Sequence, residues 1–549
     1  MGHLFFFTSI VFLCFIGYLQ PFHSAPWPSA INDGLFLLLG FTGLAYNLIT
    51  IKNYKLSLTN KEIIVIGLIL THITLSAISF ENRSAWPYVL VLSIVYLLYK
   101  NEIKYSIIQN YLIAGIWIAA SVTAIIGIGQ WLGVWHQFDG RFLWMLEVSP
   151  GTSMIGNLGQ PNVTGTLLVW GVISALVISA KIETKFARIV SQQVTYGLMS
   201  ASIILITIAS VLIQSRTTTL GLFATTLLAW KFKSVYGKRA LWTTVAVFVF
   251  HVAGSVLLPY VRQFLFESQL TTAYGGKGIV DYPRLNAYWI FINAIFERPI
   301  FGYGIGGVIS AFIQGVDAVP GIGAYFAQTH NLILEFLVWF GIPLGLVLTS
   351  ILFRFFYQSY KKIKSTNDVA LFSMLLVVLI HSMLEFPLHY VYMLVPTAIF
   401  AANFSRSATV HSLNLSRMVM SGMVLIFGTV SVLMMSEYLR FEGDIRQARL
   451  ELGITGRARP PSDATTMFLY ELNGANVMIR TEASSGMSAA QLTLFETTTS
   501  QFPMRPLIEK NIKAATFNGQ PDRALYWQNK YCAIYGLKAC ASIPPASIR

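Results

Sequence analysis

Three polar side chains stand where long apolar runs begin or end, and their types suit one kind of chemistry. His330 lies in AQTHNLILEFLVWFG (residues 327–341), Arg216 lies in IQSRTTT between two apolar runs, and Arg284 opens an amphipathic stretch. Guanidinium groups match phosphate oxygens, stay charged at every relevant pH and can stabilise a departing pyrophosphate. An imidazole near its own pKa can take a proton from an attacking hydroxyl. These residue types together indicate group transfer from a phosphate-bearing substrate.

Each of these residues also has an ordinary structural interpretation when taken alone. A histidine at a helix entrance is often a cap, and an arginine near a membrane surface often extends to the head groups. In GNLGQPN (residues 156–162), Gln160 or Asn162 can cap a helix whose first turn contains Pro161. The functional interpretation therefore depends on whether these residues gather at one place.

The segment HSMLEFPLH (residues 381–389) has the spacing of a metal site. His381, Glu385 and His389 are four residues apart and would share one face of a continuous helix. Pro387 interrupts such a helix, and no second carboxylate or thiol cluster completes a ligand set. We therefore expect no bound metal.

The composition requires a membrane to solvate the chain. Of 549 residues, 55% are hydrophobic and only 11% are charged, and a soluble protein of this size could not cover so much apolar surface. Apolar runs of about 20 residues satisfy their backbone in lipid only as helices. We predict an all-α polytopic membrane protein with about 12–13 transmembrane helices. The expected spans are 3–20, 32–51, 62–80, 85–100, 106–131, 162–180, 195–214, 217–231, 240–259, 329–357, 368–385, 388–404 and 417–436.

The basic residues set the expected orientation. Lys and Arg are more frequent in one set of alternating connections, which includes Lys52, Lys55 and Lys61, than in the other. The positive-inside rule then puts the N-terminus in the cytoplasm and the C-terminal segment outside. The net charge of +14 reflects this topology and does not indicate a nucleic-acid partner. The first run, residues 4–19, lacks a basic n-region and is expected to be a retained helix.

The chain divides into a transmembrane region, residues 1–436, and an exported segment, residues 437–549, whose composition is polar and charged. Two external loops, about 132–161 and 260–328, are long enough to indicate function. The exported segment predicts a small helical domain that contains one helical hairpin. It also contains Cys532 and Cys540, for which an oxidising compartment permits a disulfide.

The predicted topology assigns the polar residues to one leaflet. Gln160, Asn162, Arg216, Arg284, His330, Glu385 and His389 come from separate segments, yet all of them fall on the external side. No comparable cluster gathers on the cytoplasmic side, which has Lys and Arg anchors and no phosphate loop of the GxxxxGK[ST] type. This pattern disfavours an ATP-driven pump and favours an external active site that takes a polyisoprenyl diphosphate sugar from the lipid.

These motifs, in their order, resemble those of bacterial PglL-type protein O-oligosaccharyltransferases, within the superfamily of O-antigen ligases and O-antigen polymerases. The resemblance is carried by GNLGQPN, the SRTT turn at Arg216, the Arg284 helix with ERPIFGYGIGG (residues 297–307), QTHNLILEFLVWFGIPLG (residues 328–345) and HSMLEFPLHY (residues 381–390). The Gly-rich block is similar to the superfamily's Pro-x-x-Gly-x-Gly pattern, which precedes the loop histidine. GQPN and the Glu-Phe-Pro segment are more similar to the protein-modifying branch.

The resemblance implies a glycosyltransferase of the bacterial inner membrane. Its activity would be transfer, in the periplasm, of a preassembled oligosaccharide from undecaprenyl diphosphate to a Ser or Thr hydroxyl of an exported protein such as a pilin. Neither metal nor cofactor is implied, and the anomeric carbon inverts. His330 would be the general base, and Arg216 and Arg284 would bind the diphosphate. The further motif candidates are Gln160, Asn162, Glu385, His389 and Tyr303. The exported segment is expected to influence acceptor preference.

Other functions remain open from the sequence. An O-antigen ligase would use lipid A core as its acceptor, and an O-antigen polymerase would use another glycan. A lipid-linked sugar flippase or transporter would have polar residues through the membrane midplane and on both faces. A receptor or scaffold would act through the exported segment alone.

Overall fold

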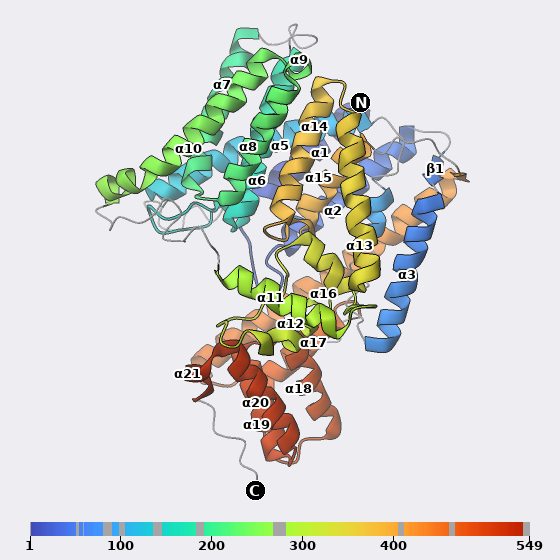
Figure 1. The fold of residues 1–549 in the computed structure, drawn as a ribbon, viewed down its shortest axis with the longest axis vertical. Helices are drawn as coiled ribbons and strands as arrows, with labels where there is room; N and C mark the ends of the chain where they lie inside the picture. Colours follow the sequence, from blue (N-terminus) through green and yellow to red (C-terminus); the bar gives the residue numbers. More distant parts are fainter. Residues whose placement is uncertain are drawn as a thin grey trace. The chain divides into compact units, whose positions relative to one another are not determined.

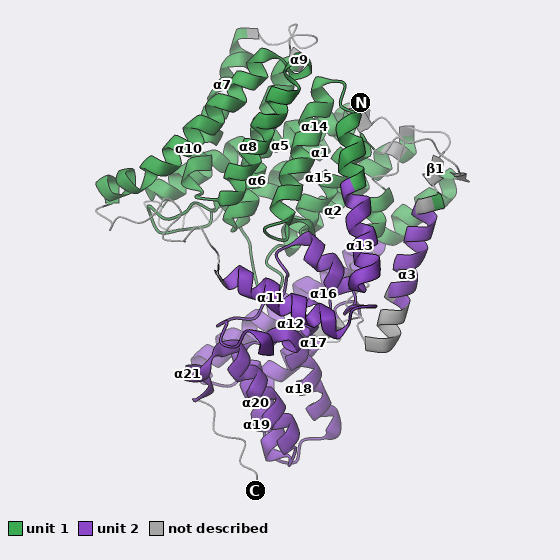
Figure 2. Cartoon of the chain, viewed as in Figure 1, with its two compact units in different colours: residues 1–60, 91–280, 354–428 green, residues 61–90, 281–353, 429–549 purple. Residues whose placement is uncertain are grey.

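The computed structural model describes residues 2–50, 54–58, 60–80, 91–97, 105–135, 145–182, 192–266, 282–404, 411–459 and 467–541. The chain forms two compact units (Figure 2). Unit 1 comprises Met1–Asn60, Val91–Val280 and Arg354–Gly428, and unit 2 comprises Lys61–Leu90, Asp281–Phe353 and Thr429–Arg549. The division falls inside α13 (Leu332–Lys361) and α16 (Arg417–Thr455), and after the first residue of α3 (Asn60–Phe80).

Unit 1 is a bundle of apolar helices (Figure 1). Its elements are α1 (Gly2–Leu19), α2 (Ala30–Thr50), β1 (Tyr54–Leu58), α5 (Tyr105–Leu132), the 3-10 helix η2 (Gly156–Leu158), α6 (Pro161–Ile182), α7 (Gln192–Leu212), α8 (Arg216–Lys231), α9 (Lys233–Tyr236), α10 (Lys238–Phe266), α14 (Thr366–Ser382), the 3-10 helix η4 (Pro387–His389), α15 (Val391–Ala402) and β2 (His411–Leu415). Helix α6 lies at its centre and contacts α5, α7, α8 and α14. The two strands pair antiparallel, with Tyr54 opposite Leu415.

Unit 2 combines membrane helices with helices of the polar C-terminal segment. Its further elements are α3 (Asn60–Phe80), α11 (Tyr282–Glu297), α12 (Val308–Gly315), the 3-10 helix η3 (Val316–Ala318), α17 (Tyr470–Arg480), α18 (Ala489–Gln501), α19 (Arg505–Phe517), α20 (Pro521–Tyr535) and α21 (Leu537–Cys540). Helices α19 and α20 form the hairpin that the sequence predicts.

The chain is an all-α polytopic membrane protein, with one two-stranded sheet among the described residues. Six described helices are long and apolar enough to span a membrane: α5, α6, α7, α10, α13 and α16. Shorter apolar helices include α1, α2, α14 and α15. Each predicted span coincides with a helix except 85–100, of which only 91–97 lie within the described residues, and these are helical. The apolar helix α12 lies inside the predicted external loop 260–328.

Helix α16 is continuous across the predicted boundary at residues 436 and 437. The composition becomes polar there, but the new residues are good helix formers such as Arg, Glu and Leu, so the helix does not end. It continues to Thr455. The membrane helix and the start of the C-terminal segment are therefore one element.

Helix α13 is broken at Gly341, and the break creates a docking site for the Gly-rich block. Gly341 has φ +72° and ψ 178°, a conformation that is essentially restricted to glycine. The carbonyl of Trp339 has no helical donor because Pro343 lacks an N–H. Instead, Tyr303 N–H donates to the Val338 carbonyl (2.8 Å) and Gly304 N–H donates to the Trp339 carbonyl (2.9 Å). These bonds fix the Gly-rich block on the first half of α13.

We expect Gly341→Ala to destabilise unit 2 by about 1–3 kcal/mol, since a side chain at this backbone conformation is strained. An added Cβ would also lie against the Ile300 carbonyl. The thermal unfolding midpoint of the detergent-purified protein measures the effect. Gly422→Ala in α16 is the matched control, because its Cβ would meet no atom within 4 Å. Equal midpoints for the two variants would contradict the argument.

The C-terminal helices share a hydrophobic core with the region before α13. Trp527 and Tyr531 of α20 are each 1% exposed and pack in one cluster with Phe291 of α11 and Phe312 of α12. Two backbone bonds join the same parts, from Gly321 N–H to the Ala533 carbonyl (2.6 Å) and from Gly323 N–H to the Ile534 carbonyl (2.7 Å). Lys530 Nζ also pairs with Asp317 at 2.5 Å, and Cys532 and Cys540 form a disulfide. The C-terminal segment is thus built into unit 2.

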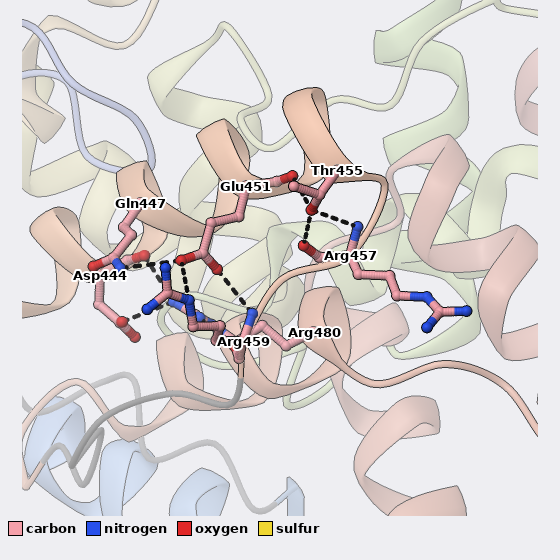
Figure 3. A network of polar contacts seen from close by, with 7 residues as sticks. All are labelled: Asp444, Gln447, Glu451, Thr455, Arg457, Arg459 and Arg480. Carbon is pink, nitrogen blue, oxygen red and sulfur yellow. Dashed lines mark hydrogen bonds and ion pairs between the residues drawn. The ribbon is translucent and has the colours of Figure 1, made fainter.

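A network of charges holds α17 against α16 (Figure 3). The buried Arg480 guanidinium pairs with Asp444 at 2.7 Å and donates to the Arg459 carbonyl at 2.6 Å. Arg459 pairs in turn with Glu451 at 3.2 Å. Nearby, the buried Glu437 carboxylate accepts N–H groups from Met467, Phe468 and Leu469. These bonds fix the start of α17 against α16 within unit 2.

Candidate active site

In unit 1 the GNLGQPN segment forms a tight turn that is held from several sides. Gly156 (φ +58°) and Gly159 (φ +72°) adopt left-handed conformations that glycine tolerates best. The Gln130 side chain accepts from Gly156 N–H at 3.0 Å and donates to the Gly156 carbonyl at 3.1 Å. Asn157 is fully buried and donates to the Leu19 carbonyl at 2.5 Å. The turn therefore delivers Gln160 and Asn162 at a fixed place.

Asn162 joins three segments that are far apart in the chain. Its amide nitrogen donates to Glu385 Oε1 at 3.0 Å, and its amide oxygen accepts from Ser215 Oγ at 2.7 Å. Ser215 caps α8 by accepting from Thr218 N–H at 3.2 Å. Arg216 is the first residue of that helix. The contacts thus bring together Asn162, Glu385 and the start of the Arg216 helix, and Gln160 lies two residues away.

The Gln160 side chain has a polar atom without a bonding partner. Its Oε1 is buried and makes no hydrogen bond to any described residue. Buried amide oxygens are normally bonded. An unsatisfied acceptor beside Asn162 suits the recognition of a substrate N–H or O–H group.

Helix α8 is short for a membrane span. Its 16 residues extend roughly 24 Å at about 1.5 Å per residue, whereas a hydrocarbon core is about 30 Å thick. A guanidinium at the end of a short apolar helix is costly in lipid, which makes a functional role the default interpretation for Arg216.

The residues His381, Glu385 and His389 do not form a shared ligand set. His381 Nδ1 lies 2.9 Å from Thr166 Oγ1, whereas Glu385 bonds Asn162. Helix α14 ends at Ser382, before Glu385, and His389 lies in η4, which begins at Pro387; the His389 ring contacts Phe386. Within the described part of the chain, no group of three His, Cys, Asp or Glu residues could hold a metal ion.

In unit 2 His330 lies two residues before the start of α13 at Leu332. Asn331 caps this helix, because its Oδ1 accepts from Ile333 N–H (3.0 Å) and Leu334 N–H (3.1 Å). His330 itself has φ +57°. The left-handed region is uncommon for residues other than glycine and costs free energy. The imidazole is half-buried and its ring meets Phe326 edge-on at 5.7 Å.

Helix α11 connects Arg284 with His330. Tyr288 Oη donates to the His330 carbonyl at 3.1 Å. Arg284 and Tyr288 are four residues apart on α11, so they share one face with Cβ atoms roughly 5–6 Å apart. The structure therefore brings Arg284 to within about one helical turn of the contact with His330.

Tyr303 is a packing residue of unit 2. It is 4% exposed, its hydroxyl donates to the Ala294 carbonyl at 2.9 Å, and Arg298 lies over its ring. Burial raises the pKa of Tyr303 to about 12, so the phenol keeps its proton at neutral pH. These contacts suit it to hold the Gly-rich block on α11 and not to act as a base.

The turns before α8 and before α13 each contain a non-glycine residue with positive φ. Among the described residues, the non-glycine residues with positive φ are Gln214 (φ 52°) and His330 (φ 57°). Gln214 precedes the capping residue Ser215, and His330 precedes the capping residue Asn331. Strained backbone clusters at functional sites. The strain therefore marks the same two turns that the sequence motifs select.

Sequence reasoning missed Ser215 and Tyr288 as contacts of these turns. Ser215 precedes Arg216 and is a residue type that caps helices, which was an available signal. Tyr288 follows Arg284 by four residues, but an aromatic residue in an apolar stretch also suits a membrane interface. Its bond to His330 spans 42 residues and has no local signature.

Two parts of the chain match known protein families, and both parts contain candidate site residues. Residues 201–349 match the protein family described as O-antigen ligase, and this range contains Arg216, Arg284, Tyr303 and His330. Residues 369–543 match the family described as the C-terminal part of a virulence factor membrane-bound polymerase. This range contains Glu385 and His389.

Two curated relatives come from Acinetobacter baylyi. A ComP-specific O-oligosaccharyltransferase is 24% identical over 317 residues, which is 57% of this chain and 49% of the relative. A general O-oligosaccharyltransferase is 24% identical over 402 residues, which is 69% of this chain and 66% of the relative. The matched region thus spans about half of the first relative and just under two thirds of the second.

Proposed function

We propose that the chain is a glycosyltransferase of the protein O-oligosaccharyltransferase type, and the matches to the O-antigen ligase family and to the two curated relatives support this proposal. Its donor is an oligosaccharide on undecaprenyl diphosphate, and its acceptor is a Ser or Thr hydroxyl of an exported protein such as a pilin. The names of the two relatives support this acceptor class. The chain is a multi-pass membrane protein, and we propose the inner membrane as its location. Its N-terminus is then cytoplasmic, and its active site and C-terminal segment are periplasmic, as the basic connections predict.

The proposed reaction is a single displacement at the anomeric carbon. The His330 imidazole takes the proton of the acceptor hydroxyl as its oxygen attacks. The bond from the anomeric carbon to the phosphate oxygen breaks, and undecaprenyl diphosphate leaves with the electron pair. Arg284 stabilises the charge on the leaving diphosphate, and we assign phosphate binding to Arg216 as well. One displacement inverts the anomeric carbon and needs no metal ion.

One observation carries the proposal more than any other. His330 holds a left-handed backbone before α13 and is bonded through its carbonyl to Tyr288, one helical turn from Arg284. A base and a phosphate-binding cation are thus supported by one pair of helices. This is the pairing that transfer from a diphosphate donor requires.

The test is mass spectrometry of exported proteins from cells with and without the gene. We expect a glycan on Ser or Thr of at least one exported protein only when the gene is present. The same experiment with the His330→Asn variant should give the result of the deletion. Unmodified exported proteins in every strain would contradict the proposal.

A second candidate activity is ligation to lipid A core or polymerisation of O-antigen, which the two family descriptions favour. Both would use the same displacement with a sugar hydroxyl as acceptor. Gel analysis of lipopolysaccharide separates them from the main proposal. Loss of the lipopolysaccharide ladder on deletion, with exported proteins unchanged, would favour the second candidate.

Arg216→Lys is expected to reduce transfer about 10-fold to 100-fold although the charge is kept. A lysine ammonium is a point charge that cannot reproduce the two-pronged guanidinium contact with phosphate oxygens. Initial rates with purified protein, lipid-linked donor and acceptor peptide measure the effect. Arg239→Lys in α10 is the matched control. The Arg239 guanidinium lies over the Tyr196 ring and has no role in the proposed reaction, so this variant should keep the wild-type rate. A wild-type rate for Arg216→Lys would remove Arg216 from the proposed site.

A further inference from the structure

The conformation of His330 needs contacts that hold it in place. Its backbone has φ +57°, which costs a β-carbon-bearing residue free energy that other interactions must offset. Glu335 holds the preceding residue Thr329, Tyr288 bonds the His330 carbonyl, and the Phe326 ring contacts the imidazole. Two of these residues, Glu335 and Tyr288, have no role in the proposed reaction so far.

Glu335 holds the residue before His330. Its Oε2 accepts from Thr329 N–H at 3.1 Å and from Thr329 Oγ1 at 2.5 Å. Thr329 is fully buried and Glu335 is 3% exposed. A carboxylate is buried at a high cost unless hydrogen bonds satisfy it. The bonds to Thr329 satisfy one of the two oxygens of this carboxylate, Oε2.

A capping role does not explain Glu335. Asn331 already accepts from the N–H groups of Ile333 and Leu334, which are the donors that an N-terminal cap serves. The printed bonds of Glu335 instead go back to Thr329, outside the helix. Its carboxylate thus closes the turn that contains His330.

Tyr288 holds the other side of the same turn. Its hydroxyl donates to the His330 carbonyl at 3.1 Å, and the Phe326 ring supports the imidazole edge-on. With Thr329 fixed by Glu335 and the His330 carbonyl fixed by Tyr288, rotation of the His330 backbone out of its left-handed conformation breaks a hydrogen bond. The direction of the imidazole is therefore determined by two side chains from two helices.

We propose that Glu335 and Tyr288 are positioning residues that keep the His330 imidazole aimed at the attacking hydroxyl. This inference rests on the proposed function, in which His330 is the general base. Positioning acts on the chemical step, because a base displaced by about 1 Å can lose about 100-fold in rate. The binding of donor and acceptor is left unchanged.

The test is steady-state kinetics of purified variants with a lipid-linked donor and an acceptor peptide. We expect kcat to fall about 10-fold in Tyr288→Phe and about 100-fold in Glu335→Leu, with KM for both substrates within about 2-fold. Glu335→Gln keeps an oxygen acceptor and Thr329→Ser keeps the hydroxyl. Both conservative variants should therefore retain kcat within about 3-fold of wild type.

Tyr535→Phe is the matched control for Tyr288→Phe. Tyr535 also donates its hydroxyl to a backbone carbonyl, that of Pro503, at 2.8 Å, but in the C-terminal hairpin. It should leave kcat unchanged. Wild-type kcat in both Tyr288→Phe and Glu335→Leu, with His330→Asn inactive, would overturn the positioning roles and leave the proposed function intact. An active His330→Asn would instead overturn the proposed function.

Discussion

Replacing His330 by asparagine should abolish glycan transfer while the protein stays folded. Asparagine adopts the left-handed backbone more readily than most residues, so the turn with φ +57° is kept. Its amide cannot accept the proton of an attacking hydroxyl. Loss of a general base lowers rates by about 100-fold to 10,000-fold. Initial transfer rates of purified protein, beside the amount of protein in the membrane, measure both parts of the prediction.

The choice of asparagine separates chemistry from backbone strain. Alanine at this position would remove the imidazole and strain the turn together, so its effect has two causes. Asn331→Ala supplies the complementary control, since it removes the cap of α13 and keeps the imidazole. A transfer rate in His330→Asn within about 3-fold of wild type would refute the role of His330 as the base.

Trp527→Ala is expected to have the largest effect on stability. Trp527 is 1% exposed and fills the core that joins α20 to α11 and α12. Removing a buried tryptophan side chain costs about 3–5 kcal/mol through lost burial and the cavity that remains. Thermal unfolding of the detergent-purified protein should show a much lower midpoint. Transfer should fall on every acceptor protein, because α11 also carries Arg284 and Tyr288.

The neighbouring residue provides the control for this prediction. Tyr526 is 43% exposed, so Tyr526→Ala removes a similar ring but leaves little cavity. Its midpoint should stay close to that of wild type. Trp527→Ala with a normal midpoint and selective loss of one acceptor would contradict a structural role. It would instead assign acceptor preference to α20.

Most of the membrane helices could be predicted because apolar length is a local property of the sequence. Runs of about 20 apolar residues have few alternatives to a helix in lipid. The break in α13 had a local signal in Gly341 and Pro343. The sequence did not show that the carbonyls freed by the break accept hydrogen bonds from Tyr303 and Gly304. The continuity of α16 was missed because a change in polarity is not a change in helix propensity.

The sequence predicted which residue types form the candidate site, but only part of the contacts between them. His330 and Arg216 were selected by their chemistry, but the sequence does not reveal that His330 is itself left-handed or that Gln214, two residues before Arg216, is. The bonds of Asn162 to Ser215 and Glu385 cross 53 and 223 residues. Pairings over such separations depend on the packed bundle and leave no periodic pattern in the sequence.

The core that contains Trp527 also has a consequence for the order of folding. It joins Ala287–Val338 to residues near the end of the chain, from Ile508 to Ile534. During synthesis the first group emerges long before the second, so its apolar surface stays without its partner until α19 and α20 have been made. A chain that stops before α19 therefore exposes that surface permanently.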